Sequence, residues 1–243
     1  MNHYVIGDVH GHYTTLMKLV SLLPTDARLV FVGDLIDRGP SSADVVRFVR
    51  ENHHLSVLGN HEEAMITQGF AISRCFEMGE ALPTHSIWFS NGGVRTLRSY
   101  GLVRLEEGKP VKCDDYAEGL QRFKDDMKWM EKLPLYLEFP IHHPSGKTVV
   151  VSHAPIGSAW EMRNVDSMYE TFSRLVTTSR RDPDPSDAPI FNVFGHTPMQ
   201  NGPRIREHFV NIDTGCYKEE EGYGLLSAYC IETGEVISTE VVR

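Results

Sequence analysis

The sequence has few cysteines, no excess of positive charge and no long apolar run. Its 243 residues include four cysteines, and none of them forms a CxxC pair. In a chain of this length, so few cysteines indicate free thiols in a reducing compartment and not a disulfide framework. The 33 acidic residues outnumber the 24 basic ones and give a formal net charge of −9. We therefore expect no nucleic-acid partner.

No apolar run approaches the roughly 20 residues that a membrane-spanning helix needs. A candidate metal ligand already stands at Asp8, which leaves no room for a secretory signal peptide before it. We therefore expect a cytoplasmic protein that has no membrane partner. No linker divides the chain, so a single domain over residues 1–243 is expected.

Apolar runs and the helical spacings between them predict an α/β fold. Strands are expected at 4–6, 28–32 and 55–58, with helices at 12–23 and 41–51 between them. This βαβαβ order predicts a parallel sheet with right-handed crossovers. Residues 67–133 break the alternation and predict a mainly helical insert. Further strands, expected to form a second sheet, lie at 135–139, 148–152, 190–194, 208–212, 224–231 and 236–242, with a cap loop at about 157–189.

Five short blocks place metal-capable side chains directly after apolar runs. They are Gly7-Asp8-Val9-His10-Gly11, Gly33-Asp34-Leu35-Ile36-Asp37-Arg38-Gly39, Gly59-Asn60-His61-Glu62, Ser152-His153-Ala154 and Gly195-His196-Thr197-Pro198. Loops that leave buried strands are where an α/β sheet normally binds its ligand. Any one block could arise by chance, but five in order, each after a strand, indicate a shared site.

The blocks supply a set of oxygen and nitrogen donors that suits Mn, Fe or Zn. The candidate ligands are Asp8, His10, Asp34, Asn60, His153 and His196. Asp8 and His10 are two residues apart, so in an extended turn both side chains can point to the same side. Asp34 could bridge two ions with its two oxygens. The amide oxygen of Asn60 and the two later histidines would complete a second metal site.

Three further residues suit the hydrolysis of a phosphate ester. Two metal ions about 3.5–4 Å apart can hold a hydroxide between them for in-line attack on phosphorus. His61, beside Asn60, is placed to protonate the departing alkoxide as a general acid. Asp37 would orient that imidazole and favour its charged form, and Arg38 would bind phosphate oxygens. We therefore expect a two-metal phosphoesterase whose substrate contacts Arg38, Asn60 and His61.

The five blocks resemble the signature motifs of the calcineurin-like metallophosphoesterases. They look most like the serine/threonine phosphoprotein phosphatase branch in its compact bacterial and bacteriophage-lambda form. The resemblance implies a four-layer α/β/β/α sandwich with two mixed sheets and a dinuclear metal centre on the loops at the strand ends. It also implies two divalent ions, with manganese favoured over iron or zinc. One ion would be held by Asp8, His10 and Asp34, and the other by Asp34, Asn60, His153 and His196.

The chain departs from this branch at a second phosphate-binding arginine. The branch usually supplies it in a Trp-x-Arg block between the positions that match His153 and His196. Here that region reads Tyr169-Glu-Thr-Phe-Ser-Arg174-Leu and lacks the tryptophan. Four arginines remain as candidates, namely Arg163, Arg174, Arg180 and Arg181.

Three functions are compatible with these residues. The leading expectation is a phosphatase of phosphoserine and phosphothreonine in proteins, with phosphotyrosine as a further substrate. The alternative is a hydrolase of nucleotides or diadenosine polyphosphates. The related symmetrical dinucleoside tetraphosphatases typically carry Ala at the position of Asp37 and Asp at that of Glu62, which favours the first function. A non-catalytic binding module is disfavoured because all six candidate ligands and His61 are present.

Overall fold

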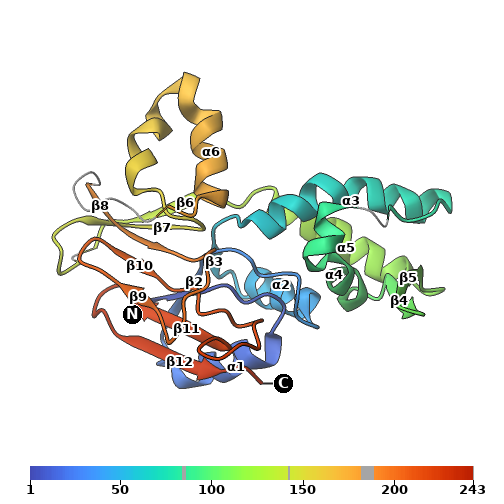
Figure 1. The fold of residues 1–243 in the computed structure, drawn as a ribbon, viewed down its shortest axis with the longest axis horizontal. Coiled ribbons are helices and arrows are strands. Elements are labelled where there is room, and N and C mark those ends of the chain that lie inside the picture. The colour runs from blue at the N-terminus through green and yellow to red at the C-terminus, as the bar shows by residue number, and fades with distance from the viewer. Residues whose placement is uncertain (84–85, 142, 182–188, 243) are drawn as a thin grey trace.

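Two five-stranded mixed sheets lie face to face at the centre of the computed structural model, which describes residues 1–83, 86–141, 143–181 and 189–242 (Figure 1). The first sheet has the order β12-β11-β1-β2-β3 and comprises β1 (His3–Ile6), β2 (Arg28–Phe31), β3 (Leu55–Ser56), β11 (Leu225–Cys230) and β12 (Val236–Glu240). The second has the order β6-β7-β8-β10-β9 and comprises β6 (Tyr136–Phe139), β7 (Thr148–Ser152), β8 (Ile190–Phe194), β9 (Arg204–Ile205) and β10 (Phe209–Asn211).

The first sheet has the parallel centre that the βαβαβ order predicts. β1, β2 and β3 run parallel, and Val30 of β2 lies opposite Val5 of β1 and Leu55 of β3. Their crossovers are α1 (Tyr13–Leu22) and α2 (Ser42–Glu51). β11 then pairs with β1 in the antiparallel direction, which makes the sheet mixed.

Alternation along the strands sends side chains into separate cores and so produces the layers. Tyr4 and Ile6 of β1 face the helices, where they share a core with Leu16 of α1. Val5, between them, faces the second sheet and shares a core with Val151 of β7. Helices, two sheets and further helices therefore stack in the predicted four-layer order.

The outer layer beyond the second sheet is mainly helical where the sequence predicted a cap loop. It comprises η2 (Gly157–Asn164), η3 (Asp166–Met168) and α6 (Tyr169–Thr178). Val150 of β7 packs there with Trp160 and Val176. Phe172 and Val176 are buried at i, i+4 spacing, which gives α6 the apolar stripe that holds it on the sheet. Residues 182–188 of the predicted cap loop lie outside the described residues.

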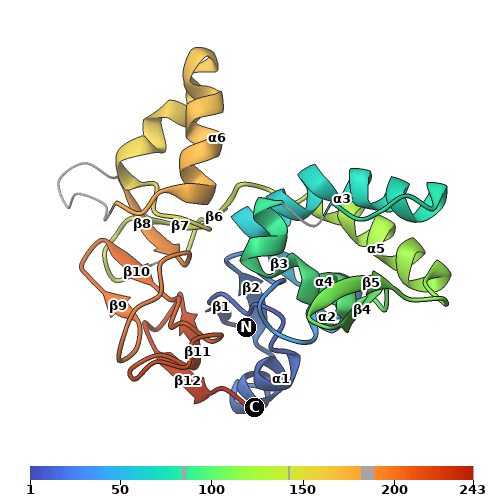
Figure 2. The ribbon, with the colours of Figure 1, turned by 45° about the vertical axis from the view of Figure 1, so that its right-hand side comes forward.

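The insert expected at 67–133 forms an arm that projects from the body in a different direction from α6 (Figures 1 and 2). It contains α3 (Asn60–Met78), η1 (Phe89–Gly93), α4 (Val94–Ser99) and α5 (Ala117–Met130). It also contains an unexpected hairpin of β4 (Val103–Glu106) and β5 (Lys109–Lys112). Glu107 and Gly108 both have positive φ, as a two-residue hairpin turn requires.

The five sequence blocks follow the ends of five strands. Asp8 follows β1, Asp34 follows β2 and Asn60 opens α3 shortly after β3, while His153 and His196 follow β7 and β8. The fold thus gathers at one place the side chains that the sequence scatters over almost 190 positions. In the part of the chain that the structure describes, no helix combines the length and apolarity needed to cross a membrane.

Candidate metal centre and active site

The loops that carry the predicted site have a strained backbone. Positive φ angles occur at His10 (46°), Asp34 (48°), Asp37 (71°), Arg38 (63°) and His196 (70°). These are five of the eight non-glycine residues with positive φ in the described ranges. Such conformations cost of order 1–3 kcal/mol each and persist only where the surroundings enforce them. Because these strained residues are concentrated in the predicted blocks, the geometry of the site lowers the local stability of the loops.

One group of donor atoms surrounds the imidazole of His153. Its Nδ1 donates to the carbonyl of Val32 at 2.8 Å, so in the neutral ring Nε2 carries a lone pair. This Nε2 lies 2.9 Å from Oδ1 of Asn60, 3.4 Å from Oδ1 of Asp34 and 3.1 Å from Nδ1 of His196. Burial lowers the pKa of His153, and burial together with His153 lowers the pKa of His196 to about 3. Neutral rings and oxygen lone pairs that converge in this way fit a bound cation.

The second group shares Asp34 with the first. His10 donates from Nδ1 to the carbonyl of Ile36 at 2.8 Å, and its Nε2 faces Oδ2 of Asp34 at 3.6 Å. Nε2 of His61 lies 3.8 Å from the same oxygen. Oδ1 of Asp34 therefore faces the first group and Oδ2 the second. The carboxylate is oriented as a bridge between two metal positions would require.

Asp8 lies behind these groups and does not line the pocket. Its buried carboxylate accepts the backbone N–H of His196 at 3.2 Å, and a Cβ on Gly195 would collide with it. Burial, and after it the charges of Asp213 and Asp34, raise the pKa of Asp8 well above its usual value. Burial likewise raises the pKa of Asp213 to about 7.

Several buried nitrogen and oxygen atoms of the site, which could bind a metal ion, have no hydrogen-bond partner within the described residues. They include Nε2 of His196 and Oδ2 of Asp213. An unpaired buried polar atom costs about 1–3 kcal/mol, so such atoms in a native site call for a ligand. Among the candidate ligands, two buried carboxylates and three buried imidazoles provide the hard and borderline donors that divalent metal ions prefer. The residues therefore fit divalent metal binding.

Asp37 and His61 form a tightly supported pair. Nδ1 of His61 lies 2.6 Å from Oδ2 of Asp37. The same carboxylate accepts Nε1–H of Trp88 at 2.9 Å and the hydroxyl of Thr96 at 2.6 Å. Burial acts to lower the pKa of His61, but the charge of Asp34 and the bond to Asp37 outweigh it, and the net shift is upward. The arrangement favours the protonated ring.

Trp88 and Thr96 were not among the predicted site residues. Trp88 opens the stretch Trp88-Phe-Ser-Asn91-Gly92-Gly93, which also resembles the phosphoprotein phosphatase branch but gave no role to Trp88 itself. Nothing in the sequence around Thr96 indicates that it reaches Asp37, because the contact depends on how α4 packs against the second block. Both side chains are fully buried.

Glu62 is a further residue whose role the sequence left open. Its carboxylate accepts the backbone N–H groups of Asp34 at 2.8 Å, Leu35 at 2.9 Å and Gly59 at 3.1 Å. It thereby ties the second block to the start of α3 and fixes the turn that presents Asp34. The signal was available, since Glu three residues after the residue that precedes a helix is the pattern of a capping box.

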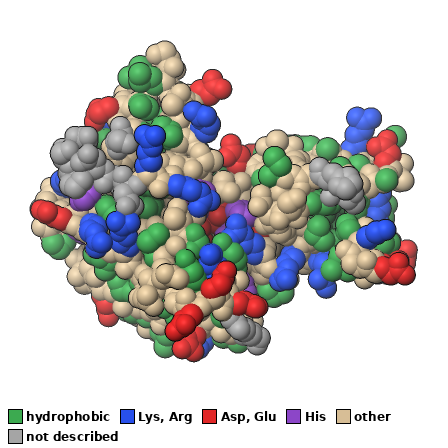
Figure 3. All heavy atoms as spheres, viewed as in Figure 1, with side chains coloured by type: hydrophobic (Ala, Val, Ile, Leu, Met, Phe, Trp, Pro, Cys, Tyr) green, Lys and Arg blue, Asp and Glu red, His purple; other side chains and the backbone are tan. Residues whose placement is uncertain are grey.

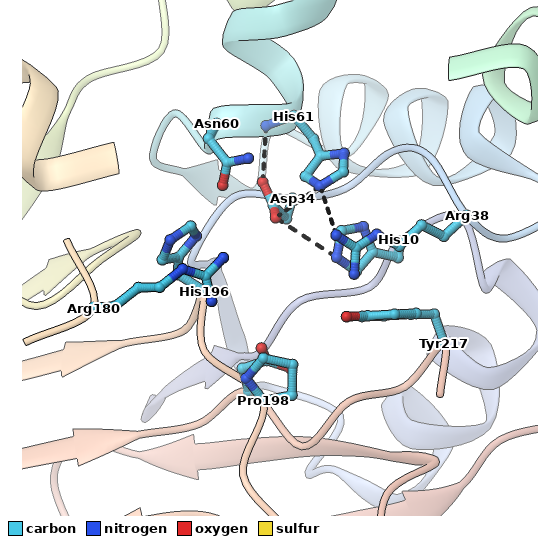
Figure 4. Close-up of a pocket in the computed structure, with 10 residues that line it drawn as sticks. His10, Asp34, Arg38, Asn60, His61, Arg180, His196, Pro198 and Tyr217 are labelled. Carbon is cyan, nitrogen blue, oxygen red and sulfur yellow. Dashed lines mark hydrogen bonds and ion pairs between the residues drawn. The ribbon is translucent and has the colours of Figure 1, made fainter. Parts of the chain in front are cut away.

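The two groups of donor atoms around Asp34, called the metal groups below, open into a small pocket of about 50 Å³ (Figure 4). Its lining includes Arg38, Arg180 and Tyr217. The guanidinium of Arg38 stacks on the ring of Tyr217 at 3.9 Å, and its Nη2 lies 3.2 Å from Nε2 of His61. Tyr217 lay outside the predicted site and also packs edge-on against His10.

The structure separates the four arginines that the sequence left open. Arg180 lines the pocket beside His196, on the side away from Arg38. Arg163 instead stacks on Trp160 at 3.7 Å. Arg174 and Arg181 line a different cavity, which Arg180 also borders. Among the four, Arg180 is the one that lines the pocket at the metal groups.

Comparison with known proteins relates the chain to phosphoesterases over most of its length. The model of the calcineurin-like phosphoesterase family matches residues 1–215. An asymmetrical bis(5'-nucleosyl)-tetraphosphatase of Halalkalibacterium halodurans is 29% identical, over 89% of this chain and 86% of the relative. Serine/threonine-protein phosphatase 1 of Salmonella typhimurium is 31% identical, over 87% of this chain and 85% of the relative.

A solved structure described as a candidate diadenosine tetraphosphatase supports the fold. It superposes with a TM-score of 0.63 at 24% identity and covers all of this chain and 94% of its own. The predicted family, fold class and enzyme class are confirmed by these findings together. With its metal-binding side chains gathered at the strand ends, the chain is a metal-dependent phosphoric ester hydrolase and belongs to the calcineurin-like phosphoesterase family.

Proposed function

We propose that this enzyme hydrolyses dinucleoside polyphosphates such as diadenosine tetraphosphate. This is the alternative function considered from the sequence, and it now takes precedence over the protein phosphatase. Two relatives named as asymmetrical bis(5'-nucleosyl)-tetraphosphatases support it, at 29% and 27% identity over 89% and 87% of this chain. The 31% identical protein phosphatase keeps phosphoserine and phosphothreonine peptides as the competing substrates.

The observation that carries the proposal is positive charge on both sides of the metal groups. Arg38 borders the pocket beside His61, and Arg180 borders it beside His196 (Figure 4). A phosphate chain that is cut internally carries negative oxygens on both sides of the reacting phosphorus. Guanidinium groups bind such oxygens through charge-assisted, planar hydrogen bonds. Arginines on two sides of the site suit this substrate. The protein phosphatase branch also binds phosphate with two arginines, so the two asymmetrical tetraphosphatase relatives are what favours the dinucleotide.

Asp37 and Glu62, the two residues that favoured a protein phosphatase, are weaker evidence for that function once their contacts are known. Asp37 accepts bonds from His61, Trp88 and Thr96, and Glu62 accepts backbone N–H groups of the loops. Neither carboxylate lines the pocket. Because both residues build the site and neither faces a substrate, they discriminate poorly between substrates.

The proposed ligand assignment keeps the set expected from the sequence; the two donor groups contain five of its six residues, and Asp8 lies outside them. We propose that Asp8, His10 and Asp34 hold one ion, and that Asp34, Asn60, His153 and His196 hold the other. Manganese is the proposed metal, and the proposed location is the cytoplasm. When bound, two divalent ions would supply positive charge to the phosphate and acidify the attacking water.

His61 lies close enough to join the second donor group, with His10 and Asp34, but its contacts favour the role of general acid. Its Nδ1 is engaged by Asp37, and its Nε2 faces the pocket beside Arg38. In hydrolysis, water adds its oxygen to one phosphorus and a bridging P–O bond breaks. The departing oxygen takes the proton from Nε2 of His61, whose charged form Asp37 stabilises before the transfer. The attacking water releases a proton to solvent, and solvent then protonates the neutral ring again.

A rate comparison tests the proposed substrate. Mn²⁺-supplied enzyme would be assayed at equal concentration on diadenosine tetraphosphate, p-nitrophenyl phosphate, and phosphoserine and phosphothreonine peptides. We expect kcat/KM for the dinucleotide to exceed that for the peptides. The reverse order would assign the site to phosphoproteins, and activity on p-nitrophenyl phosphate would show in either case that the preparation is active.

A further inference from the structure

A second cavity lies on the arm, where the arm meets Pro40 just after the second block. It has a volume of about 480 Å³, and its walls include Arg95 and Arg98 of α4, Arg104 of β4, and the apolar side chains of Pro40, Val103 and Leu105. No motif in the sequence indicates this cavity, because α4 and the β4–β5 hairpin form it together.

The cavity is joined to the active site through α4 and the second block. Nη1 of Arg95 donates to the backbone carbonyl of Arg38 at 2.7 Å. A Cβ on Gly92, just before α4, would lie only 2.6 Å from the backbone nitrogen of Arg38, so the two segments touch. Thr96, on the buried side of the same helix, binds Asp37. One short helix therefore supports the catalytic pair on one side and presents arginines on the other.

The charge of this cavity is unusual for a protein with a net charge of −9. Among the described residues, Arg98 has no ion pair or side-chain hydrogen bond, and Arg95 has no carboxylate partner. Arg104 differs, since it pairs with Glu106 at 2.7 Å. Figure 3 shows Lys and Arg side chains around the histidine in the hollow between body and arm, and further ones on the near side of the arm where α4 lies in Figure 1.

We propose that this cavity binds the distal nucleoside phosphate of the substrate, an inference that rests on the proposed function. Arg95 and Arg98 would hold phosphate oxygens that lie beyond Arg38. The apolar wall of Val103, Leu105 and Pro40 would contact the base, against which a guanidinium can also stack. A phosphate chain would then run from the metal groups past Arg38 into the cavity.

The test compares a substrate that can reach the cavity with one that is too short to do so. We expect Arg98→Ala to lower the ratio of kcat/KM for diadenosine tetraphosphate to that for p-nitrophenyl phosphate by about tenfold or more, mainly through KM. The matched control is Arg206→Ala, which removes an exposed arginine next to β9 and should leave the ratio unchanged. The p-nitrophenyl phosphate rate also shows that each variant is folded.

The outcomes separate this inference from the proposed function. If the wild type cleaves the dinucleotide and Arg98→Ala keeps the wild-type ratio, the cavity does not bind the distal nucleotide while the proposed function stands. If the wild type cleaves p-nitrophenyl phosphate but not the dinucleotide, the proposed function fails and the inference with it. If Arg98→Ala selectively slows a phosphopeptide instead, the cavity is a peptide site and the nucleotide assignment is overturned.

Discussion

The loops at the strand ends and the helical segments around them contribute to the site in different ways. The loops carry the metal-binding groups in five short blocks, each of which follows a strand and is held by a hydrogen bond to Glu62 or to a backbone carbonyl. The helices contribute Trp88, Thr96 and the arginines of α4, and the segment after α6 contributes Arg180; all of them reach the site only through tertiary packing. The loops therefore supply the reacting groups, and the segments around them support the catalytic pair and add substrate-binding charge.

Asp34→Asn should have the largest effect, because it weakens the bridge shared by both donor groups. Metals supply several kcal/mol of transition-state stabilisation, so kcat/KM should fall by about 1000-fold. Metal content, measured by mass spectrometry, should fall with it. Asp44→Asn, an exposed change on α2, is the matched control. A fully metallated and active Asp34 variant would contradict the bridging role.

His61→Ala should slow the hydrolysis of an alkyl phosphate by about 100- to 10,000-fold, because its leaving group needs a proton. The loss on p-nitrophenyl phosphate, which has a better leaving group, should be smaller. Steady-state rates on both substrates and the metal content of the variant check this prediction. Metal loss would instead make His61 a ligand, as its place near Asp34 allows.

Asp37→Asn should move the pH dependence. The pKa of His61 is raised because the charge of Asp34 and the bond to Asp37 outweigh burial, so the acid form persists to higher pH. Activity on an alkyl phosphate should therefore decline as pH rises through that raised pKa. Without the Asp37 charge, the decline should begin at lower pH, as a profile of kcat/KM would record. An unchanged alkaline limb would show that another group controls it.

Arg180→Ala should have the smallest effect of these four, a rise in KM for diadenosine tetraphosphate of about tenfold with metals retained. Arg163→Ala is the matched control, because Arg163 stacks on Trp160 and does not line the pocket. Equal effects of the two changes would remove Arg180 from the binding site. This comparison tests directly whether the segment after α6 takes part in substrate binding.

The contrast between the strand-end loops and the segments around them also explains how much of the structure the sequence could predict. The apolar runs of β1 and β2 predicted the first sheet, and the block after each strand predicted which side chains lie together at the site. Tyr217, Trp88 and Arg180 were missed or left undecided because no local pattern shows where their side chains point. The hairpin β4–β5 was also missed, although its Glu107-Gly108 turn is a recognisable signal. Strands, turns and the residues that directly follow them can thus be predicted from the sequence, while side-chain contacts between distant segments cannot.

The central claim is that Asp34 bridges two metal positions while His61 stays free to carry a proton. Anomalous diffraction from crystals loaded with Mn²⁺ tests it most directly. Two peaks are predicted, one on each side of the Asp34 carboxylate, one beside His10 and the other beside His153 and His196, with Nε2 of His61 outside both coordination shells. A single peak, or a peak coordinated by His61, would contradict the account.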